Sequence, residues 1–340
     1  MPKISGFVQG MYQANLTDEG KLMEGDKAST FRMRRVRMSV EGKLSPKVSY
    51  KVQGDFVNTP MIVDAFLKYQ ACDAFAVQVG QFKTPFTLES PINPVNLEIF
   101  DYGESVQNLV GYSDVCGVGG LGRDIGIMAT GKLFPVKGEE GYKYSIVQYS
   151  LGVFNGNGPV NFKKNEKGLD NNNRKDLVGR LEVHPGLKAL TLSGSYYYGN
   201  YFKDTINNGT RNRWSAGLQY NDGNLLVRGE YIQGTTGHMT YTWGNHAGYS
   251  MEVNEDFLYS RGYYAVAGYN FRLGKDKSQT LMPVLRYEQF MHDGAATDYY
   301  TVGINYWPLK SVNFKLDYSL VQKESGDNSH RVVGILSYKF

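Results

Sequence analysis

Long apolar runs are absent from this chain of 340 residues. A transmembrane helix needs about 20 consecutive apolar residues, and no stretch approaches that length, so a helical membrane span is excluded. Cysteine is scarce as well: Cys72 and Cys116 stand alone, without the spacing of a metal or redox site, and we interpret them as unpaired thiols. The net charge of +4 is too small to predict nucleic-acid binding.

A secretory signal peptide is also missing, because a strand pattern begins almost at once with Ile4, Gly6 and Val8. We therefore expect a mature or recombinant form of the chain. Tyrosine, with 26 residues, and glycine, with 40, are abundant. Tyrosine suits a membrane–water boundary, and glycine suits tight turns and crowded walls. A mean hydropathy of -0.41 does not exclude a membrane, since a β-barrel span is apolar only at every second position.

Apolar and polar residues alternate along strand-length segments from end to end, and no helical period competes with this pattern. The last segment, Ser329 to Phe340, alternates in this way and ends on an aromatic residue, which resembles the closing strand of a bacterial outer-membrane β-barrel. If one face of this strand meets lipid, all strands must be paired into a closed barrel. Sixteen strands are predicted, near residues 3–14, 30–44, 47–57, 61–71, 74–83, 123–133, 142–155, 175–184, 187–199, 211–221, 223–233, 257–272, 279–290, 297–307, 311–322 and 329–340.

The connections between these strands alternate in length. The long ones, 15–29, 84–122, 156–174, 200–210 and 234–256, all follow odd-numbered strands. Short periplasmic turns alternating with longer external loops are typical of outer-membrane barrels, and an even strand count puts both termini on one side. The sequence therefore predicts an all-β fold, a transmembrane antiparallel β-barrel of about sixteen strands that forms a single domain over residues 1–340.

The connection 84–122 is the candidate constriction loop. Loops of this length without secondary structure are usually functional or disordered. Leu97, Ile99 and Phe100 argue against disorder, because apolar side chains seek burial. We expect the loop to fold into the lumen and narrow the pore.

The two faces of the predicted strands differ in chemistry. The face assigned to lipid carries ten tyrosines, many of them near strand ends, as expected for an aromatic girdle: Tyr50, Tyr69, Tyr144, Tyr196, Tyr220, Tyr231, Tyr287, Tyr306, Tyr318 and Tyr338. The opposite face is rich in charge, which requires a water-filled interior, since each unpaired buried charge costs several kcal/mol. Its acids are Glu41, Asp55, Asp64, Asp124, Glu182, Glu230, Glu288 and Asp317.

Basic residues on this inward face, with two that flank the long loop, are the candidate pore-lining residues and anion path. Rings or rows of Arg and Lys are how pores favour anions. Arg34 is expected to point outward, and Arg180/Glu182, Arg228/Glu230 and Arg286/Glu288 are same-face pairs that should neutralise one another and weaken selectivity. The predicted set is Arg35, Arg37, Lys51, Lys68, Lys83, Arg123, Arg180, Arg213, Arg228, Arg286 and Lys315.

Several segments together resemble a known family. They are TFRMRRVRMSVEGKL at 30–44, VGQFKTPFTLE at 79–89, GRDIG at 122–126 and LGVFNGNG at 151–158. In this order they are similar to the phosphate-selective porin family, of the porin O and P type. The resemblance implies a sixteen-stranded, trimeric outer-membrane porin with a loop folded into its channel. It does not by itself imply that phosphate is selected.

Other sites are weakly indicated. The run 117–122 matches G-x-G-x-x-G, but a dinucleotide site needs a strand before it and a helix after it, and here a long loop precedes it and a strand follows. No nucleophile and base are paired by the pattern; His238 and His246 share one loop and are the remaining metal candidates. We therefore expect no enzyme activity, no cofactor and no metal.

The sequence thus predicts a porin of the bacterial outer membrane for passive diffusion of small hydrophilic solutes, anionic or neutral. A mild anion preference is expected, with phosphate as one candidate. The expected partners are outer-membrane lipid and two further copies in a homotrimer, and no nucleic acid. The alternative is a structural or adhesin barrel that acts through its external loops.

Overall fold

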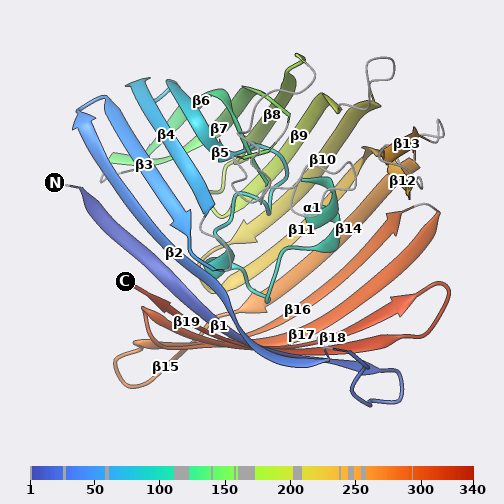
Figure 1. Cartoon of the computed structure of the whole chain (residues 1–340). Coiled ribbons are helices and arrows are strands. Elements are labelled where there is room, and N and C mark those ends of the chain that lie inside the picture. Colours follow the sequence, from blue (N-terminus) through green and yellow to red (C-terminus); the bar gives the residue numbers. More distant parts are fainter. Residues whose placement is uncertain are drawn as a thin grey trace.

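The computed structural model describes residues 2–25, 28–57, 61–110, 122–138, 141–156, 158–159, 173–201, 209–236, 239–243, 249–253, 258–292 and 294–340. Its strands form a closed barrel (Figure 1). Successive spans pair antiparallel, and β1 pairs with both β2 and β19, so the sheet has no free edge there. Closure satisfies the backbone groups of every span, as a lipid environment demands. In the described part of the chain, no helix is long and apolar enough to cross a membrane.

The sixteen expected strands are confirmed, with one span broken at Asn270 into β14 and β15, both of which pair with β16. The short hairpin of β12 (Met239–Trp243) and β13 (Tyr249–Val253) is an addition within the connection 234–256. The barrel strands are β1 (Lys3–Thr17), β2 (Ser29–Ser45), β3 (Val48–Asp55), β4 (Met61–Cys72), β5 (Phe75–Lys83), β6 (Arg123–Gly138), β7 (Gly141–Phe154), β8 (Asp176–Val183), β9 (Leu190–Tyr201), β10 (Gly209–Asn221), β11 (Leu225–Thr236), β14 (Leu258–Tyr269), β15 (Phe271–Leu273), β16 (Gln279–His292), β17 (Ala295–Leu309), β18 (Val312–Lys323) and β19 (Ser329–Lys339).

The two chain ends lie at the same end of the barrel, as an even number of spans requires (Figure 1). Phe340 donates its backbone N–H to the carbonyl of Gly6 across 3.0 Å, so the closing strand is hydrogen-bonded to the first strand up to its last residue.

The outer wall is apolar and exposed. Along β18, Leu316 is 58% exposed whereas its neighbours Lys315 and Asp317 are buried, which is the period-2 alternation that the sequence predicts. The same exposure is found on neighbouring spans, at Leu192, Tyr196, Leu218, Val302, Ile304 and Leu336.

We expect Leu316→Arg to impair barrel assembly. An arginine on the lipid face costs about 2–4 kcal/mol near the bilayer midplane. Leu316→Ala, which removes bulk without adding charge, is the matched control and should assemble nearly normally. The fraction of folded protein, measured by heat-modifiable migration in gels after refolding into lipid, checks this. Equal assembly of both variants would show that this face does not contact lipid.

A β-bulge corrects one sequence-based expectation. The register of β1 and β2 shifts between Gln9, opposite Arg35, and Gly10, opposite Met33, so Arg34 is an extra residue on β2. A bulge re-aims a side chain without changing the rest of the strand. Arg34 points into the barrel with 9% of its side chain exposed, and the expected outward position at the lipid interface is wrong.

A second expectation is wrong without the help of a bulge. Tyr144 lies an even number of residues from Phe154, whose side chain packs in the lumen core, and the pairing of β6 with β7 keeps one register between these two residues. The side chain of Tyr144 is 9% exposed and its ring packs edge-on against His184 at 6.3 Å. Tyr144 therefore belongs to the inward face by simple alternation, and its expected place on the outward aromatic face is wrong.

The connection after β5 folds into the lumen, where Figure 1 shows it with its short helix α1 inside the ring of strands. It contains the 3-10 turn η1 (Pro94–Asn96) and α1 (Glu104–Leu109). Its apolar side chains pack against inward-facing residues of the wall, which explains why the segment is ordered. From the loop these are Phe86, Leu97, Ile99, Tyr102, Val106, Leu109 and Val110, and from the wall Phe82, Phe154, Val178, Tyr197, Ile232, Tyr264, Val266, Val284 and Phe290.

Candidate functional site: a constriction inside the barrel

A cavity of about 240 Å³ lies between this lumen loop and the inner wall formed by β2 to β6. We call it the constriction. The wall supplies basic side chains, and the loop supplies Pro91, Asn93 and Pro94. The remaining lining residues are Arg37, Lys51, Gln53, Asp64, Phe66, Gln78, Phe82, Lys83 and Arg123.

The cations of the constriction outnumber its acids. Arg123 donates from Nε to Oδ1 of Asp64 at 2.7 Å, and the ammonium of Lys51 lies 3.6 Å from Oδ2 of the same carboxylate. Arg37 donates from Nε to Asp55 at 2.8 Å. With Lys83, four cations therefore share two carboxylates, and the local balance is +2 (four minus two). A low-dielectric wall focuses such a field into the lumen.

Lys83 ends β5 and fixes the start of the lumen loop. Its ammonium donates to the carbonyls of Ser90 and Ile92, the latter at 3.0 Å, and to the hydroxyl of Tyr102 at 2.9 Å. These neutral acceptors leave the charge of Lys83 in the constriction while its position is fixed.

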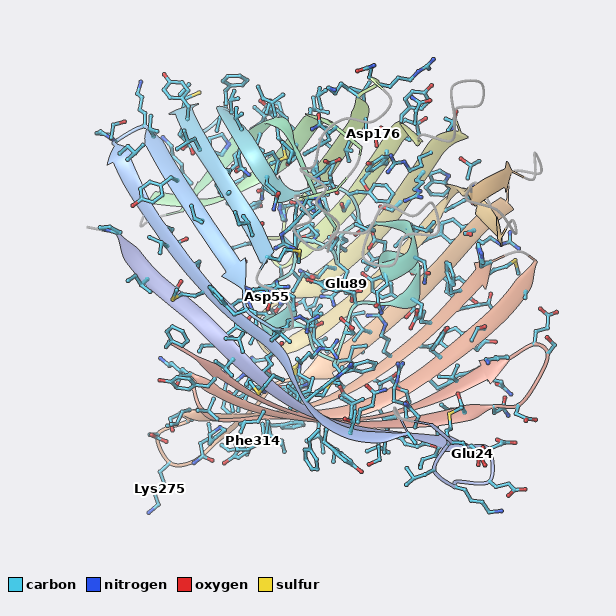
Figure 2. The ribbon with its side chains drawn as sticks, viewed as in Figure 1. Glu24, Asp55, Glu89, Asp176, Lys275 and Phe314 are labelled. Carbon is cyan, nitrogen blue, oxygen red and sulfur yellow. The ribbon has the colours of Figure 1, made fainter. Side chains whose placement is uncertain are left out.

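Away from the constriction, ion pairs between acids of the loop and arginines of the wall hold the loop in place, and we call these contacts the clamp. Glu89 is fully buried and accepts from Arg286 Nη1 at 2.6 Å and from Arg228 Nη2 at 3.2 Å. Arg228 also pairs with Glu98 at 2.6 Å. Figure 2 shows Glu89 inside the ring of strands. Charge-assisted bonds of this kind are about twice as strong as neutral ones.

A second part of the clamp lies near the closing strands. Asp101 bridges Arg34 and Arg35, which both point inward because of the β2 bulge. Lys315 on β18 donates its ammonium to the carbonyls of Leu97 and Ile99.

Further contacts tie the loop backbone to the wall. Arg213 donates to the carbonyl of Leu109 at 2.6 Å, and Arg180 donates to that of Thr87 at 3.1 Å. Glu230 accepts from the backbone N–H of Leu88 at 2.7 Å.

The three expected self-neutralising pairs are found only in part. Arg180 lies 3.3 Å from Glu182, and Arg286 lies 3.4 Å from Glu288. The third arginine, Arg228, pairs with the loop acids Glu89 and Glu98 instead, because the lumen loop brings carboxylates that strand parity does not contain.

The structure divides the eleven predicted pore-lining residues among three places. Arg37, Lys51, Lys83 and Arg123 border the constriction. Arg35, Arg213, Arg228, Arg286 and Lys315 contact the loop, and Arg180 contacts both the loop and Glu182. Lys68 and Arg180 line a separate polar cavity of about 280 Å³ nearer the Cys72–Ala74 turn.

Sequence reasoning missed the loop acids Glu89, Glu98 and Asp101. The sequence does contain a signal for them. Three carboxylates occur in a segment without a strand pattern, and the predicted inner face has more bases than acids for them to pair with. The clamp turns these acids toward the wall, so the loop presents the uncharged residues Pro91, Asn93 and Pro94 to the constriction. In the part of the loop that the structure describes, no acidic residue therefore lines the cavity opposite the basic wall.

The other sites considered from the sequence are a metal site, the two thiols and the glycine-rich run. Within the described residues, no group of three or more His, Cys, Asp or Glu side chains could hold a metal ion. Cys72 is an exposed free thiol. Cys116, His238, His246 and most of the G-x-G-x-x-G run, at 117–121, lie outside the described residues.

Two loop carboxyls of the clamp, those of Glu89 and Asp101, have lowered pKa values. Burial alone would raise the pKa of Glu89, but Arg286 and Arg228 more than offset it and lower the pKa below its ordinary value. The pKa of Asp101 is lowered in the same way, because two arginines outweigh burial. A carboxyl with a lowered pKa stabilises the folded state above its ordinary pKa and loses this contribution only as pH falls through the folded value. The clamp should therefore persist in mild acid.

Glu104, the first residue of α1, behaves in the opposite way. Burial, and then the nearby Glu288, raise its pKa from 4.5 to about 7. The stability that it contributes is therefore fully present below 4.5 and is lost as pH rises through about 7.

We expect the lumen loop to exchange its amide hydrogens faster at about pH 8 than at about pH 5.5, after correction for intrinsic rates, because Glu104 ionises between them. Glu104→Gln should abolish this difference, and hydrogen-exchange mass spectrometry of peptides from 86–110 measures it. Glu24→Gln, in the connection between β1 and β2 (Figure 2), is the control and should leave it intact. A pH effect that survives in Glu104→Gln would assign the titration to another group.

The sequence of this chain matches one known protein family. Residues 8–334 match the family model described as phosphate-selective porin O and P. A search of curated protein sequences gave no match.

Solved structures share the fold over the whole chain. The chain is similar to an anion-selective porin from Comamonas acidovorans, at 11% identity and a TM-score of 0.65, over 100% of this chain and 99% of that one. It is also similar to the outer-membrane channel DcaP of Acinetobacter baumannii, at 14% identity and a TM-score of 0.64, over 100% and 97%. The trimer form of OmpT from Vibrio cholerae matches at 10% identity and a TM-score of 0.61, over 100% and 99%.

Proposed function

The chain belongs to the family of phosphate-selective porins O and P, a family of bacterial outer-membrane channels, and from this premise we propose that it passes small hydrophilic solutes by passive diffusion with a mild preference for anions. Family and fold point to a channel rather than an enzyme. Phosphate, which gives the family its name, is one candidate anion.

One observation supports the anion preference above the others. At the constriction, Arg37, Lys51, Lys83 and Arg123 face a loop whose described lining residues are uncharged, and among the described residues Asp55 and Asp64 offset them. Rings or rows of basic side chains are how pores favour anions. The surplus is +2 rather than the larger value that all eleven predicted bases would give, because the other seven do not line the constriction, and Arg35, Arg228 and Arg286 among them pair with acids of the loop. The preference should therefore be mild.

The name of the Comamonas relative, an anion-selective porin, agrees with this proposal. We also propose that the protein assembles as a homotrimer, which the trimer form of OmpT supports by analogy of fold. The expected lipid contact rests on the exposed apolar outer wall.

The test is a reversal potential across a planar bilayer in asymmetric potassium chloride. We expect a chloride-to-potassium permeability ratio above one at low salt, falling toward one as salt rises, because screening shortens the field to about 10 Å at 0.1 M. A preference for potassium in the unmodified protein would refute the anion proposal. Absence of any ohmic pore would favour the alternative, a structural or adhesin barrel that acts through its external loops.

A further inference from the structure

The constriction contains an aromatic side chain where a water-filled barrel calls for polar ones. Phe66 on β4 points into the lumen, is only partly buried, and lines the constriction beside Lys51. The two residues are direct cross-strand neighbours, since Lys51 is the register partner of Phe66 on β3. An ammonium group and an apolar ring thus stand side by side on one wall.

The other cross-strand neighbour of Phe66 has no side chain. On β5 its register partner is Gly80, which has a φ of +132°. A Cβ added at Gly80 would lie 2.2 Å from the carbonyl oxygen of Ala65, so a side chain cannot occupy this position without moving the backbone. Of the two cross-strand neighbours of Phe66, Lys51 is therefore the one that places a side chain beside the ring.

The loop side of the cavity also combines apolar and polar groups. Pro91 and Pro94 line it with apolar atoms, and Asn93 offers an amide. From the wall, Gln53 and Gln78 add further polar groups beside the cations. At about 240 Å³, the space corresponds to roughly eight waters at about 30 Å³ each. It is large enough for a small organic anion.

We propose that the constriction prefers organic anions with a compact apolar body, such as small aromatic or alicyclic carboxylates, over inorganic phosphate. This inference rests on the proposed anion preference and specifies its substrate class. The carboxylate lies toward Lys51 in the field of the basic wall, and the apolar body lies against the ring of Phe66 and the proline Pro91. Contacts with an aromatic face strengthen in a partly desolvated site, whereas inorganic phosphate gains nothing from them.

A purely structural role for Phe66 is the competing explanation. Its ring packs edge-on against Phe82 at 6.0 Å, and Phe82 belongs to the core beneath the lumen loop. Met128 on β6 packs against the same core but does not line the constriction. Met128→Gln therefore reproduces any loosening of the loop without changing the proposed ligand surface.

The experiment measures block of chloride current through single channels by added benzoate, cyclohexanecarboxylate, acetate or phosphate. In the unmodified protein, benzoate and cyclohexanecarboxylate should block at concentrations about fivefold or more below those for acetate and phosphate. Phe66→Gln should remove most of this advantage, because it takes the apolar ring away from the ligand without altering a charge of the wall. Met128→Gln should retain the advantage.

Three results would overturn the inference. Equal block of the unmodified channel by phosphate and benzoate would remove the preference while leaving anion selectivity intact. An equal loss of benzoate block in Met128→Gln and Phe66→Gln would assign the effect to loop packing. A potassium preference in the unmodified protein would remove the proposed function itself, and the organic-anion class with it.

Discussion

Replacing Arg228 and Arg286 together with methionine is expected to release the lumen loop and to raise single-channel conductance. Both guanidinium groups contact Glu89, which is fully buried, so the double change leaves that carboxylate without its cationic partners. Removing one side of a buried ion pair costs about 3–5 kcal/mol. A loss of this size should shift the loop from mostly docked to mostly undocked. Single-channel recording in symmetric salt, with limited proteolysis at 86–110, measures both consequences.

The matched control removes the acids as well. Adding Glu89→Gln and Glu98→Gln to the double variant takes the unpaired charges out of the same site, and replacing both partners of an ion pair is often close to neutral. We expect this quadruple variant to recover much of the original conductance and protease resistance. Unchanged conductance in the double variant, with the barrel folded by gel shift, would show that the clamp does not hold the loop.

Charge reversal at Lys51 should give the largest change in selectivity. Lys51→Glu changes the balance of the six charged groups at the constriction from +2 to 0, with three cations and three acids. A unit charge about 5 Å from a permeating ion contributes about 0.8 kcal/mol even in bulk water, so a change of two units corresponds to roughly a tenfold shift in permeability ratio at low salt. We expect the anion preference to disappear, as measured by reversal potentials in asymmetric potassium chloride.

Lys275→Glu makes the same change in net charge at a different place. Lys275 lies in the turn between β15 and β16, and Figure 2 shows it projecting away from the barrel. Fields of exposed charges are screened within about 10 Å at 0.1 M salt, so this control should leave the reversal potential nearly unchanged. Equal shifts in the two variants would mean that overall charge, and not the constriction, sets selectivity.

Most of the barrel could be read from the sequence because membrane strands repeat every two residues and their connections alternate in length. Both signals are local, and they identified the sixteen spans. A failure occurs where one residue is inserted. Arg34 follows the alternation in the sequence, but the bulge in β2 reverses its side. A bulge has no reliable composition signal, so strand parity alone cannot reveal it.

The candidate site was less predictable, for a different physical reason. Strand parity indicates which face Arg228 and Arg286 occupy, but it does not indicate what they meet there. Their partner Glu89 lies in a loop whose path depends on packing of Leu97, Val106 and other apolar residues against the wall. These contacts join residues that are far apart in the sequence, so a local pattern cannot reveal them. Arg286, which was expected to line the ion path, therefore turned out to hold the loop.

The clamp also has a consequence for the order in which this protein folds. Glu89 meets Arg286 across 197 positions of sequence, and the carbonyl of Leu97 meets Lys315 across 218. Every basic partner on β10, β11, β16 and β18 follows the loop in the chain. Contacts between residues so far apart in the sequence form late in folding, because the entropic cost of closing the intervening chain must be met before the contact can form. The pore therefore acquires its final width only after the last strands have joined the first, and an unfinished barrel is also an unrestricted one.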